Sequence, residues 1–347
     1  MLNPDLQEAM NLYKTLKTEA DKGVIGLDSV KDATFIAFMS EIPTTLNTQK
    51  NRRANAGLVW YRGVPGVGKT YMVLVLAKAT ESEFVRIQGR ADLTPGDIVG
   101  VEIFNPKTGE WEKRPGPVVR ANILLLDEGN RISPKSQSAF LEVNQDRAVT
   151  LGDYTFALPE FYFAVMTTNP VETGEGTFPL SAANADRFTF LIDVGYLSPG
   201  EERRLVDLDL KAVEILPLVK PERVIELRSA IANGIQLHES LKKYIRRLVR
   251  ATRPYNPGIQ WYERSPSPLV EEFVELGASP RATIAWGPTS RARALFVRGD
   301  NRVLPEDIQA LAKNILTHRI NLKSRARKAG VTVEDVISEI VERVPIP

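Results

Sequence analysis

The chemistry that this sequence can perform begins in the run Gly63-Val64-Pro65-Gly66-Val67-Gly68-Lys69-Thr70, which matches the pattern G-x-x-x-x-G-K-[ST]. Its glycines allow the backbone to curl until several N–H groups point at phosphate oxygens. Lys69 can then reach the β and γ phosphates, and the Thr70 hydroxyl can ligate Mg²⁺. The run therefore predicts a site for a nucleoside triphosphate and its metal ion.

Two adjacent carboxylates, Asp127 and Glu128, follow the aliphatic run Ile123-Leu124-Leu125-Leu126. A parallel strand buried on both faces has such a run and delivers polar residues at its C-terminal end. There Asp127 would hold the Mg²⁺ shell, and Glu128 would polarise a water for attack on the γ phosphate. A core strand that ends in a solvated acidic turn has the same pattern, but the preceding phosphate loop favours the hydrolytic interpretation.

Buried strands and a helix must position these groups. The apolar residues 57–61 predict a strand before the loop, and residues 71–77 predict a helix after it, whose N-terminus would face the phosphates. Residues 162–166 have a further buried-strand pattern, which ends in Thr167-Thr168-Asn169. Together these segments predict an α/β fold.

The chain also resembles a known family: from about Gly26 to its C-terminus it is similar to the MoxR-type AAA+ ATPases, of the helix-2-insert clade. The matching segments, in the family's order, are Arg86-Ile87-Gln88-Gly89, residues 92–100, Asp127-Glu128-Gly129-Asn130-Arg131, residues 134–139, Thr167-Thr168-Asn169-Pro170, residues 176–180, Asp186-Arg187-Phe188, residues 277–282 and His318-Arg319-Ile320. The resemblance implies an AAA+ P-loop core with a parallel five-stranded sheet, and a C-terminal, mostly α-helical lid domain.

The resemblance also implies roles for three residues outside the phosphate loop. Asn169 resembles the sensor that orients the attacking water, although an Asn before a proline is also a common turn residue. Arg187 resembles the arginine finger that a neighbouring subunit directs at the γ phosphate. Arg281 resembles the second sensor of the lid, acting within its own subunit or across an interface. Either arginine alone would be taken for a surface charge.

For cofactors and partners, the resemblance implies ATP, Mg²⁺ and a homo-oligomer, as a hexameric ring. Val24-Ile25-Gly26 resembles the segment that contacts adenine, so the predicted nucleotide site includes Ile25, Gly26 and also Tyr71 after the loop. The expected activity is chaperone-like remodelling or activation of a protein client or complex, with a von Willebrand factor A domain protein as companion. The alternatives are a nucleic-acid translocase and an ATP-binding scaffold that does not hydrolyse.

Two predicted hairpins and a basic face could contact a substrate. Residues 101–104 and 110–114 flank a run of turn residues, and residues 148–151 and 155–158 flank Gly152-Asp153. Both hairpins either touch a substrate or pack subunits together. In the C-terminal half, one helix places cations opposite its apolar face, where they could follow phosphates or pair with Glu271, Glu272 and Glu275; the cations are Lys242, Lys243, Arg246, Arg247, Arg250 and Arg253.

Composition limits the remaining possibilities. The chain has 347 residues, of which 43% are hydrophobic and 25% charged, and its formal net charge is +2. It contains no cysteine and two histidines, His238 and His318, which argues against disulfides, thiol catalysis and a histidine-rich metal centre. A near-balanced charge gives no overall attraction to nucleic acid or membrane. Because no apolar stretch is long enough to span a membrane, we expect a soluble, cytoplasmic protein without membrane insertion.

We predict three regions: an N-terminal helix at 1–22 capped by Asn3, the ATPase core at 23–197, and the helical lid domain at 198–347, where the strand pattern stops. Three departures from the family stand out. Gly129 replaces an aliphatic residue and would loosen the turn after the carboxylates. A longer spacer occupies 44–55. A proline-rich lid loop at 254–275 carries Tyr255, Trp261 and Tyr262, which form a partner surface or fix the loop to the lid.

Overall fold

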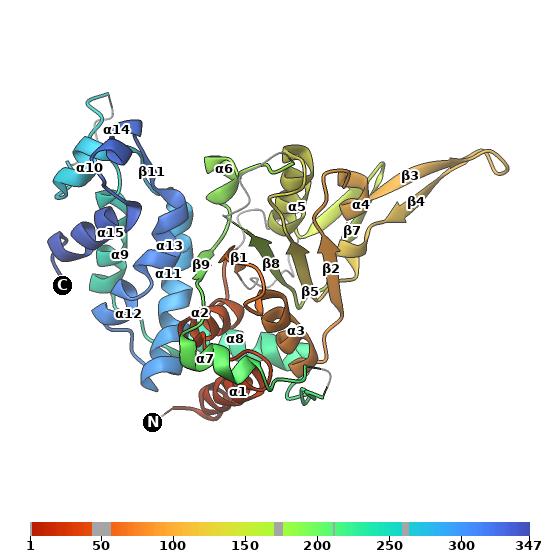
Figure 1. Ribbon diagram of the computed structural model, residues 1–347, viewed down its shortest axis with the longest axis horizontal. Coiled ribbons are helices and arrows are strands. Elements are labelled where there is room, and N and C mark those ends of the chain that lie inside the picture. Colours follow the sequence, from red (N-terminus) through yellow and green to blue (C-terminus); the bar gives the residue numbers. More distant parts are fainter. Residues whose placement is uncertain (1, 44–56, 170–175, 211, 259–263) are drawn as a thin grey trace.

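The central feature of the fold is a parallel β-sheet. The structure is a computed structural model that describes residues 2–43, 57–169, 176–210, 212–258 and 264–347. Five strands lie in the order β2-β5-β8-β1-β9, and every neighbouring pair is parallel (Figure 1). The strands are β1 (Leu58–Gly63), β2 (Phe84–Gln88), β5 (Ile123–Asp127), β8 (Phe163–Thr168) and β9 (Phe190–Val194). The predicted α/β class and parallel five-stranded sheet are confirmed.

Apolar cores cover both faces of this sheet. In β5 all five residues are buried; Ile123 and Leu125 join one core, while Leu124 and Leu126 join the other. Since side chains alternate along a strand, a continuous aliphatic run is needed to face two cores. The first core includes residues of α1 (Pro4–Asp21), α2 (Asp28–Phe38) and α3 (Lys69–Ala79), and the second those of α4 (Pro95–Val99) and α5 (Pro134–Asp146).

The N-terminal helix α1 has the predicted cap and buried face. The Asn3 side chain accepts from the Leu6 N–H, which satisfies one of the N–H groups left unpaired at a helix start. Leu6, Leu12, Tyr13 and Leu16 are buried. The helix packs against α3, α2 and α8 (Pro221–Gly234), so it lies on the body of the protein. The division at residues 22 and 197 stays a prediction.

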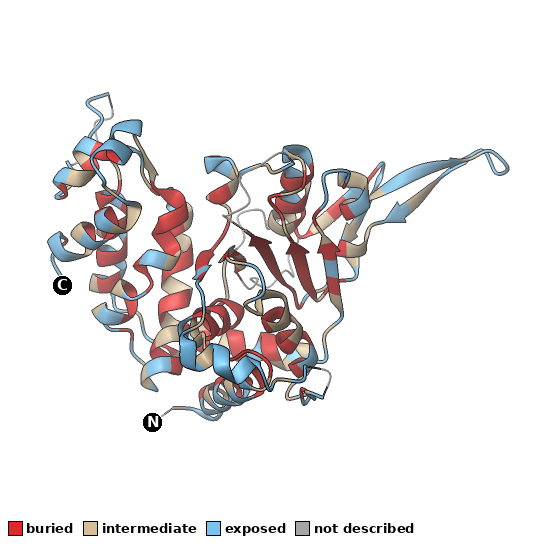
Figure 2. Cartoon of the chain, viewed as in Figure 1, coloured by how far each residue is buried: buried red, intermediate tan, exposed pale blue. Residues whose placement is uncertain are grey.

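Two antiparallel hairpins interrupt the α/β pattern, as predicted. The first consists of β3 (Gly100–Asn105) and β4 (Glu110–Pro115), between α4 and η1 (Pro117–Val119), and extends away from the body (Figure 1). The second consists of β6 (Ala148–Leu151) and β7 (Tyr154–Ala157). An ion pair of 2.5 Å between Lys113 Nζ and Asp153 Oδ1 joins them. Most of the first hairpin is exposed (Figure 2).

The C-terminal part is mostly helical, with one departure from the prediction. Val274–Leu276 (β10) and Asn321–Leu322 (β11) form a small antiparallel pair. Helix α6 (Ala182–Ala185) precedes β9. The helices that follow β9 are α7 (Pro199–Leu205), α8, α9 (Glu239–Ala251), α10 (Pro268–Phe273), α11 (Pro280–Arg293), η2 (Ala294–Arg298), α12 (Pro305–Gln309), α13 (Ala312–Leu316), η3 (Thr317–Arg319), α14 (Ser324–Lys328) and α15 (Val333–Arg343).

The lid docks on the edge strand of the sheet. Asn314 Nδ2 donates to the Leu191 carbonyl at 3.0 Å, and His318 Nε2 donates to the Phe188 carbonyl at 2.9 Å. Desolvation by burial, and then the neighbouring Arg319 charge, hold the pKa of His318 well below its ordinary value of 6.5. Among the residues that the structure describes, His318 Nδ1 also has no hydrogen-bond partner, and it is buried. The imidazole is therefore neutral in the folded protein at pH values where the unfolded chain takes up a proton.

Because His318 is buried as the neutral imidazole, the folded protein should lose stability as the pH is lowered. A histidine whose folded pKa is depressed contributes fully above its unfolded pKa of about 6.5 and destabilises as pH falls below it. We expect the free energy of unfolding to fall by at most about 1.4 kcal/mol from this group alone between pH 7.5 and 5.5. Denaturant unfolding of His318→Gln should lack this component, whereas the exposed His238→Gln should retain it. Identical pH profiles for the parent and His318→Gln would contradict the assignment.

Candidate nucleotide site

The phosphate loop joins β1 to α3 as its sequence predicts. Gly66 and Gly68 have φ values of 79° and 83°, in the left-handed region that favours glycine. A Cβ at Gly66 would meet no atom of the described residues within 4 Å, so the loop borders open space in this part of the structure. Gly68 is the N-cap of α3, so the N-terminus of the helix and the positive end of its dipole face this open space. The geometry is that of a phosphate cradle.

Lys69 folds back onto its own loop. Its Nζ donates to the carbonyls of Gly63 and Val64, the latter at 2.7 Å. The ammonium group therefore lies inside the curl of the loop, where it is held by acceptors that a phosphate would replace. A Cβ at Gly68 would lie 3.8 Å from the Val24 side chain. Val24 belongs to the predicted adenine segment, with Ile25 and Gly26.

Tyr71 and α7 complete the surroundings of the adenine segment. A Cβ at Gly23 would clash with the Tyr71 ring, and a Cβ at Gly26 would clash with Glu201 of α7. Val24 and Ile25 are buried. The predicted residues of the nucleobase site and the phosphate loop are thus neighbours in space.

Asp127 lies in a polar network that fits a hard cation. Its Oδ1 accepts from Thr167 Oγ1 at 2.6 Å, and its Oδ2 accepts from Thr70 Oγ1 at 3.2 Å. Carboxylate and hydroxyl oxygens are the donors that Mg²⁺ prefers. Arg86 Nη2 lies 2.6 Å from the same Oδ2 and balances the carboxylate charge. The side chains present fit Mg²⁺, with Arg86 as a competitor for one ligand oxygen.

Glu128 stands beside this network and is held by two side chains. Gln88 Nε2 donates to its Oε2 at 2.9 Å, and Arg131 Nε lies 3.2 Å from that oxygen. The backbone of Glu128 has φ of 54°, and its N–H donates to Thr167 Oγ1 at 2.9 Å. Such a left-handed conformation in a non-glycine residue is uncommon and is fixed here by the next strand.

Asn169 follows the end of β8, the strand between β5 and β1. Parallel strands bring their carboxyl ends to one edge of a sheet, so Asn169, the Asp127–Glu128 pair and the phosphate loop share that edge. The carbonyl of Asn169 accepts from Asn130 Nδ2 at 3.4 Å. Pro170, which follows it, lies outside the described residues.

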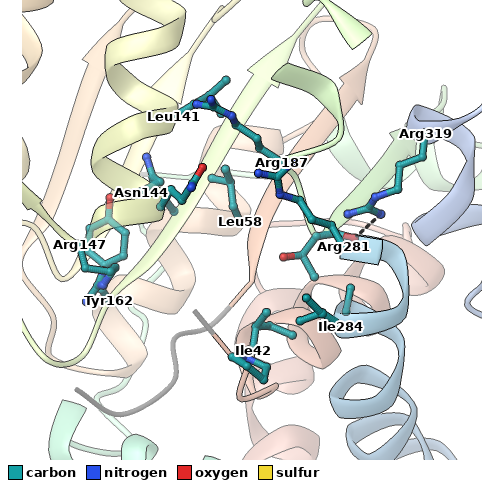
Figure 3. A pocket seen from close by; sticks show the side chains of 15 residues that line it. Ile42, Leu58, Leu141, Asn144, Arg147, Tyr162, Arg187, Arg281, Ile284 and Arg319 are labelled. Carbon is teal, nitrogen blue, oxygen red and sulfur yellow. Dashed lines mark hydrogen bonds between the residues drawn. The ribbon is translucent and has the colours of Figure 1, made fainter. Parts of the chain in front are cut away.

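Arg187 and Arg281 are not at this edge. Both line a cavity of about 120 Å³ whose other walls include Leu58, Ala164 and Thr189, at the amino-terminal ends of β1, β8 and β9. Figure 3 shows the two arginines in one hollow, with Arg319 on the lid side. A strand of six residues spans roughly 20 Å, so the amino-terminal end of β1, where this hollow lies, is about that far from the phosphate loop at its other end.

Motifs alone did not identify four residues of the site as functional. Arg86, Gln88 and Thr167 hold the two carboxylates, and Asp186 holds Arg281 at 3.0 Å. The strand register explains one of these contacts. Gln88 pairs with Asp127 where β2 and β5 are neighbours, which brings Gln88 close to the next residue, Glu128.

Gly129 does not loosen the turn after the carboxylates. Its N–H donates to the Thr167 carbonyl at 2.8 Å, and Arg131 N–H donates to the Glu128 carbonyl at 2.9 Å. A Cβ at Gly129 would lie 2.5 Å from Cγ and Sδ of Met166. The Met166 side chain thus occupies the space that an aliphatic residue would need, and the turn keeps its hydrogen bonds.

Gly89 is expected to be sensitive to substitution. A Cβ there would lie 2.2 Å from the Glu128 carbonyl oxygen and 2.8 Å from that of Asp127, and backbone atoms cannot move aside without displacing the two acids. We expect Gly89→Ala to destabilise by about 1–3 kcal/mol, by thermal unfolding, and to lower nucleotide hydrolysis. Gly200→Ala is the matched control, because its Cβ would meet nothing within 4 Å. If the two variants had the same stability and hydrolysis rate, the carbonyls of Asp127 and Glu128 would be shown to move aside without cost.

The lid carries the predicted basic helix face, but its pairing differs from the expectation. Leu241, Ile245, Leu248 and Val249 of α9 are buried. Arginines line a cavity of about 410 Å³ beside this helix: Arg246, Arg247, Arg250, Arg253 and Arg264. Glu271 accepts the N–H groups of Tyr255 and Ser265, and among the described residues it forms no ion pair with this face.

Parts of the departures from the family lie outside the described residues, namely the spacer at 44–55 and residues 259–263 with Trp261 and Tyr262. Tyr255 is described, and the Arg264 guanidinium lies 5.1 Å from the centre of its ring. Within the described ranges, no helix combines the length and apolarity needed to cross a bilayer.

A doubly covered parallel sheet, a phosphate loop, paired acids at its edge and a helical lid define an AAA+ P-loop protein. A sequence model of the ATPase family associated with various cellular activities (AAA) matches residues 58–190, and one of the AAA lid domain matches residues 267–340. Together with a relative named Chaperone MoxR1, which is 38% identical over 84% of this chain, these matches show that the chain belongs to the MoxR-type AAA+ ATPases.

Two relatives and a solved structure are similar over most of the chain. Uncharacterized protein YeaC of Bacillus subtilis is 42% identical over 84% of this chain and 86% of its own length. Chaperone MoxR1 of Mycobacterium tuberculosis is 38% identical over 84% of this chain and 74% of its own. A crystal structure from Cytophaga hutchinsonii has a TM-score of 0.81 and 34% identity, and covers 99% of this chain and 97% of that one.

Proposed function

We propose that this protein hydrolyses ATP with Mg²⁺ in a homo-oligomeric ring, a hexamer, and uses the energy to remodel a protein client. The phosphate-loop backbone and Lys69 would bind the phosphates, and Thr70 and Asp127 the metal ion. Glu128 would act as general base on a water that Asn169 orients. Bound Mg²⁺ would neutralise charge on the phosphates. We further propose the regions 1–22, 23–197 and 198–347 as helix, core and lid.

The observation that carries this proposal is the separation of the two halves of the site. The groups that hold phosphate and activate water lie at the carboxyl ends of the strands, whereas Arg187 and Arg281 line a hollow at the amino-terminal ends. Arginines that stabilise charge on the γ phosphate must come within hydrogen-bond distance of it. A second subunit would supply them, so we propose that both arginines act in trans.

The first hairpin is the proposed contact for a client. Phe104 and Trp111 are 48% and 61% exposed, and their ring centres lie 5.5 Å apart. Exposed aromatic side chains on a projecting element favour contact with another protein. The name Chaperone MoxR1 of a relative agrees with a protein client. A von Willebrand factor A domain protein stays a proposed companion.

Replacing both aromatic residues should separate client binding from folding. We expect Phe104→Ser with Trp111→Ser to lower client capture at least about tenfold, because truncating interface aromatics typically costs 2 kcal/mol or more. Capture is measured by mass spectrometry after affinity purification of tagged protein carrying Glu128→Gln with ATP. Tyr196→Ser is the control, since Tyr196 is 75% exposed on another element. Equal loss in the control would contradict a hairpin site.

The alternative is a nucleic-acid motor, and the arginine-lined cavity of the lid is the observation that favours it. Such a motor would be stimulated by DNA or RNA, with binding that weakens steeply as salt increases. Stimulation of hydrolysis at low salt would therefore favour the motor, whereas no stimulation and no binding would exclude it.

A further inference from the structure

Asp186 connects two parts of the lid, the start of α11 and η3, to the segment that carries Arg187. Its carboxylate accepts from Ser279 Oγ at 2.8 Å, from Arg281 Nη1 at 3.0 Å and from Arg319 Nε at 3.2 Å. These donors lie 93, 95 and 133 residues away in the sequence. The Asp186 side chain is 15% exposed, so the contacts form in a site that is largely screened from water.

The two arginines that share this carboxylate have different surroundings. The Arg319 side chain is 1% exposed and also donates to the carbonyls of Thr189 and Phe188, which fixes it to the backbone before β9. The Arg281 side chain is 42% exposed. Within the described ranges, its ion pair is with Asp186. Because a guanidinium has five N–H donors, Arg281 can contact Asp186 and still offer donors to an arriving phosphate.

We propose that Asp186 is a positioning residue, which holds Arg281 next to Arg187 so that both arginines meet the phosphates of a neighbouring subunit together. This inference rests on the proposed trans site and adds its regulation. Asp186 precedes Arg187 in the chain, and its other partners, Ser279 and Arg319, belong to the docked lid. Movement of the lid therefore changes the position of Arg281 relative to Arg187, and with it the completeness of the site.

The test must separate positioning from folding. Asp186→Asn leaves the buried Arg319 without its counter-charge, which can destabilise the chain strongly. Asp186→Glu keeps the negative charge but moves the carboxylate by one methylene group. Asn314→Ala is the matched structural control, because Asn314 also joins the lid to β9, through the Leu191 carbonyl and not through the Asp186 carboxylate. Each variant is assayed as the full-length oligomer for kcat, KM for ATP and thermal unfolding.

We expect Asp186→Glu to lower kcat at least tenfold with KM for ATP within about twofold of the parent, because ATP is held by another subunit's loop. Asn314→Ala should keep kcat within twofold. Adding Asp186→Glu to Arg281→Ala should cause no further loss of kcat, since a residue that acts through Arg281 has nothing left to position.

The inference is overturned by an unchanged kcat in Asp186→Glu when Arg281→Ala lowers it, or by losses that simply multiply in the double variant. If Arg187→Ala and Arg281→Ala both leave kcat unchanged, the proposed trans site is itself wrong. If Asp186→Glu loses kcat only in proportion to its loss of folded protein, as thermal unfolding would reveal, Asp186 is structural and the inference fails.

Discussion

Glu128→Gln is expected to lower kcat for ATP hydrolysis by about 10²–10⁴-fold while ATP binding is retained, because the amide cannot accept a proton from the attacking water. Glutamine keeps the size of the side chain, and the Gln88 and Arg131 contacts of Glu128 lie outside the phosphate loop. The measurement is steady-state phosphate release alongside binding of a fluorescent ATP analogue.

Lys69→Ala is the matched comparison for that result. It removes the ammonium group held within the loop, so it should lose nucleotide affinity as well as hydrolysis. Unchanged turnover in Glu128→Gln would support the scaffold alternative and contradict the role of Glu128 as base.

Arg187→Ala is expected to lower kcat by about 10³-fold or more, the effect typical of a finger that stabilises charge in phosphoryl transfer. Nucleotide affinity should change little, because Arg187 lies at the other end of β1 from the loop of its own subunit. Phosphate release and analogue binding again distinguish the two effects.

Arg62→Ala controls for loss of a surface cation. Arg62 forms an ion pair with Asp193 at 2.7 Å on the neighbouring strand, and its side chain is 33% exposed. Pairs of this kind contribute little to stability, so the control should keep its activity. A large drop in kcat in both variants would indicate that the substitutions disturb the sheet, rather than that Arg187→Ala removes an arginine finger.

Local patterns were sufficient to predict the strands and the loop at the carboxyl edge of the sheet. The loop, the buried run before Asp127 and the run before Asn169 lie within single segments, and the structure confirms the strands and the helix that they predict. The two hairpins followed from turn residues between short extended segments. Each of these features is encoded by neighbours in the sequence, so no knowledge of packing was needed.

Contacts between distant segments could not be predicted in this way. Gln88 reaches Glu128 because β2 and β5 are neighbours in a particular register, and Asp186 meets Arg319 only after the lid has docked. The β10–β11 pair was missed because segments of 3 and 2 residues are too short to show an alternating pattern. Physical proximity across the fold, not residue type, decides these interactions.

The most direct test of the composite site is to mix two inactive variants. Glu128→Gln retains Arg187, and Arg187→Ala retains Glu128, so in a mixed ring some interfaces contain both intact groups. In an equal, randomly exchanged mixture about a quarter of interfaces are complete, and we predict that ATP hydrolysis recovers toward about a quarter of the parent rate. A mixture no more active than the mean of the two variants alone would contradict a site completed by a second subunit.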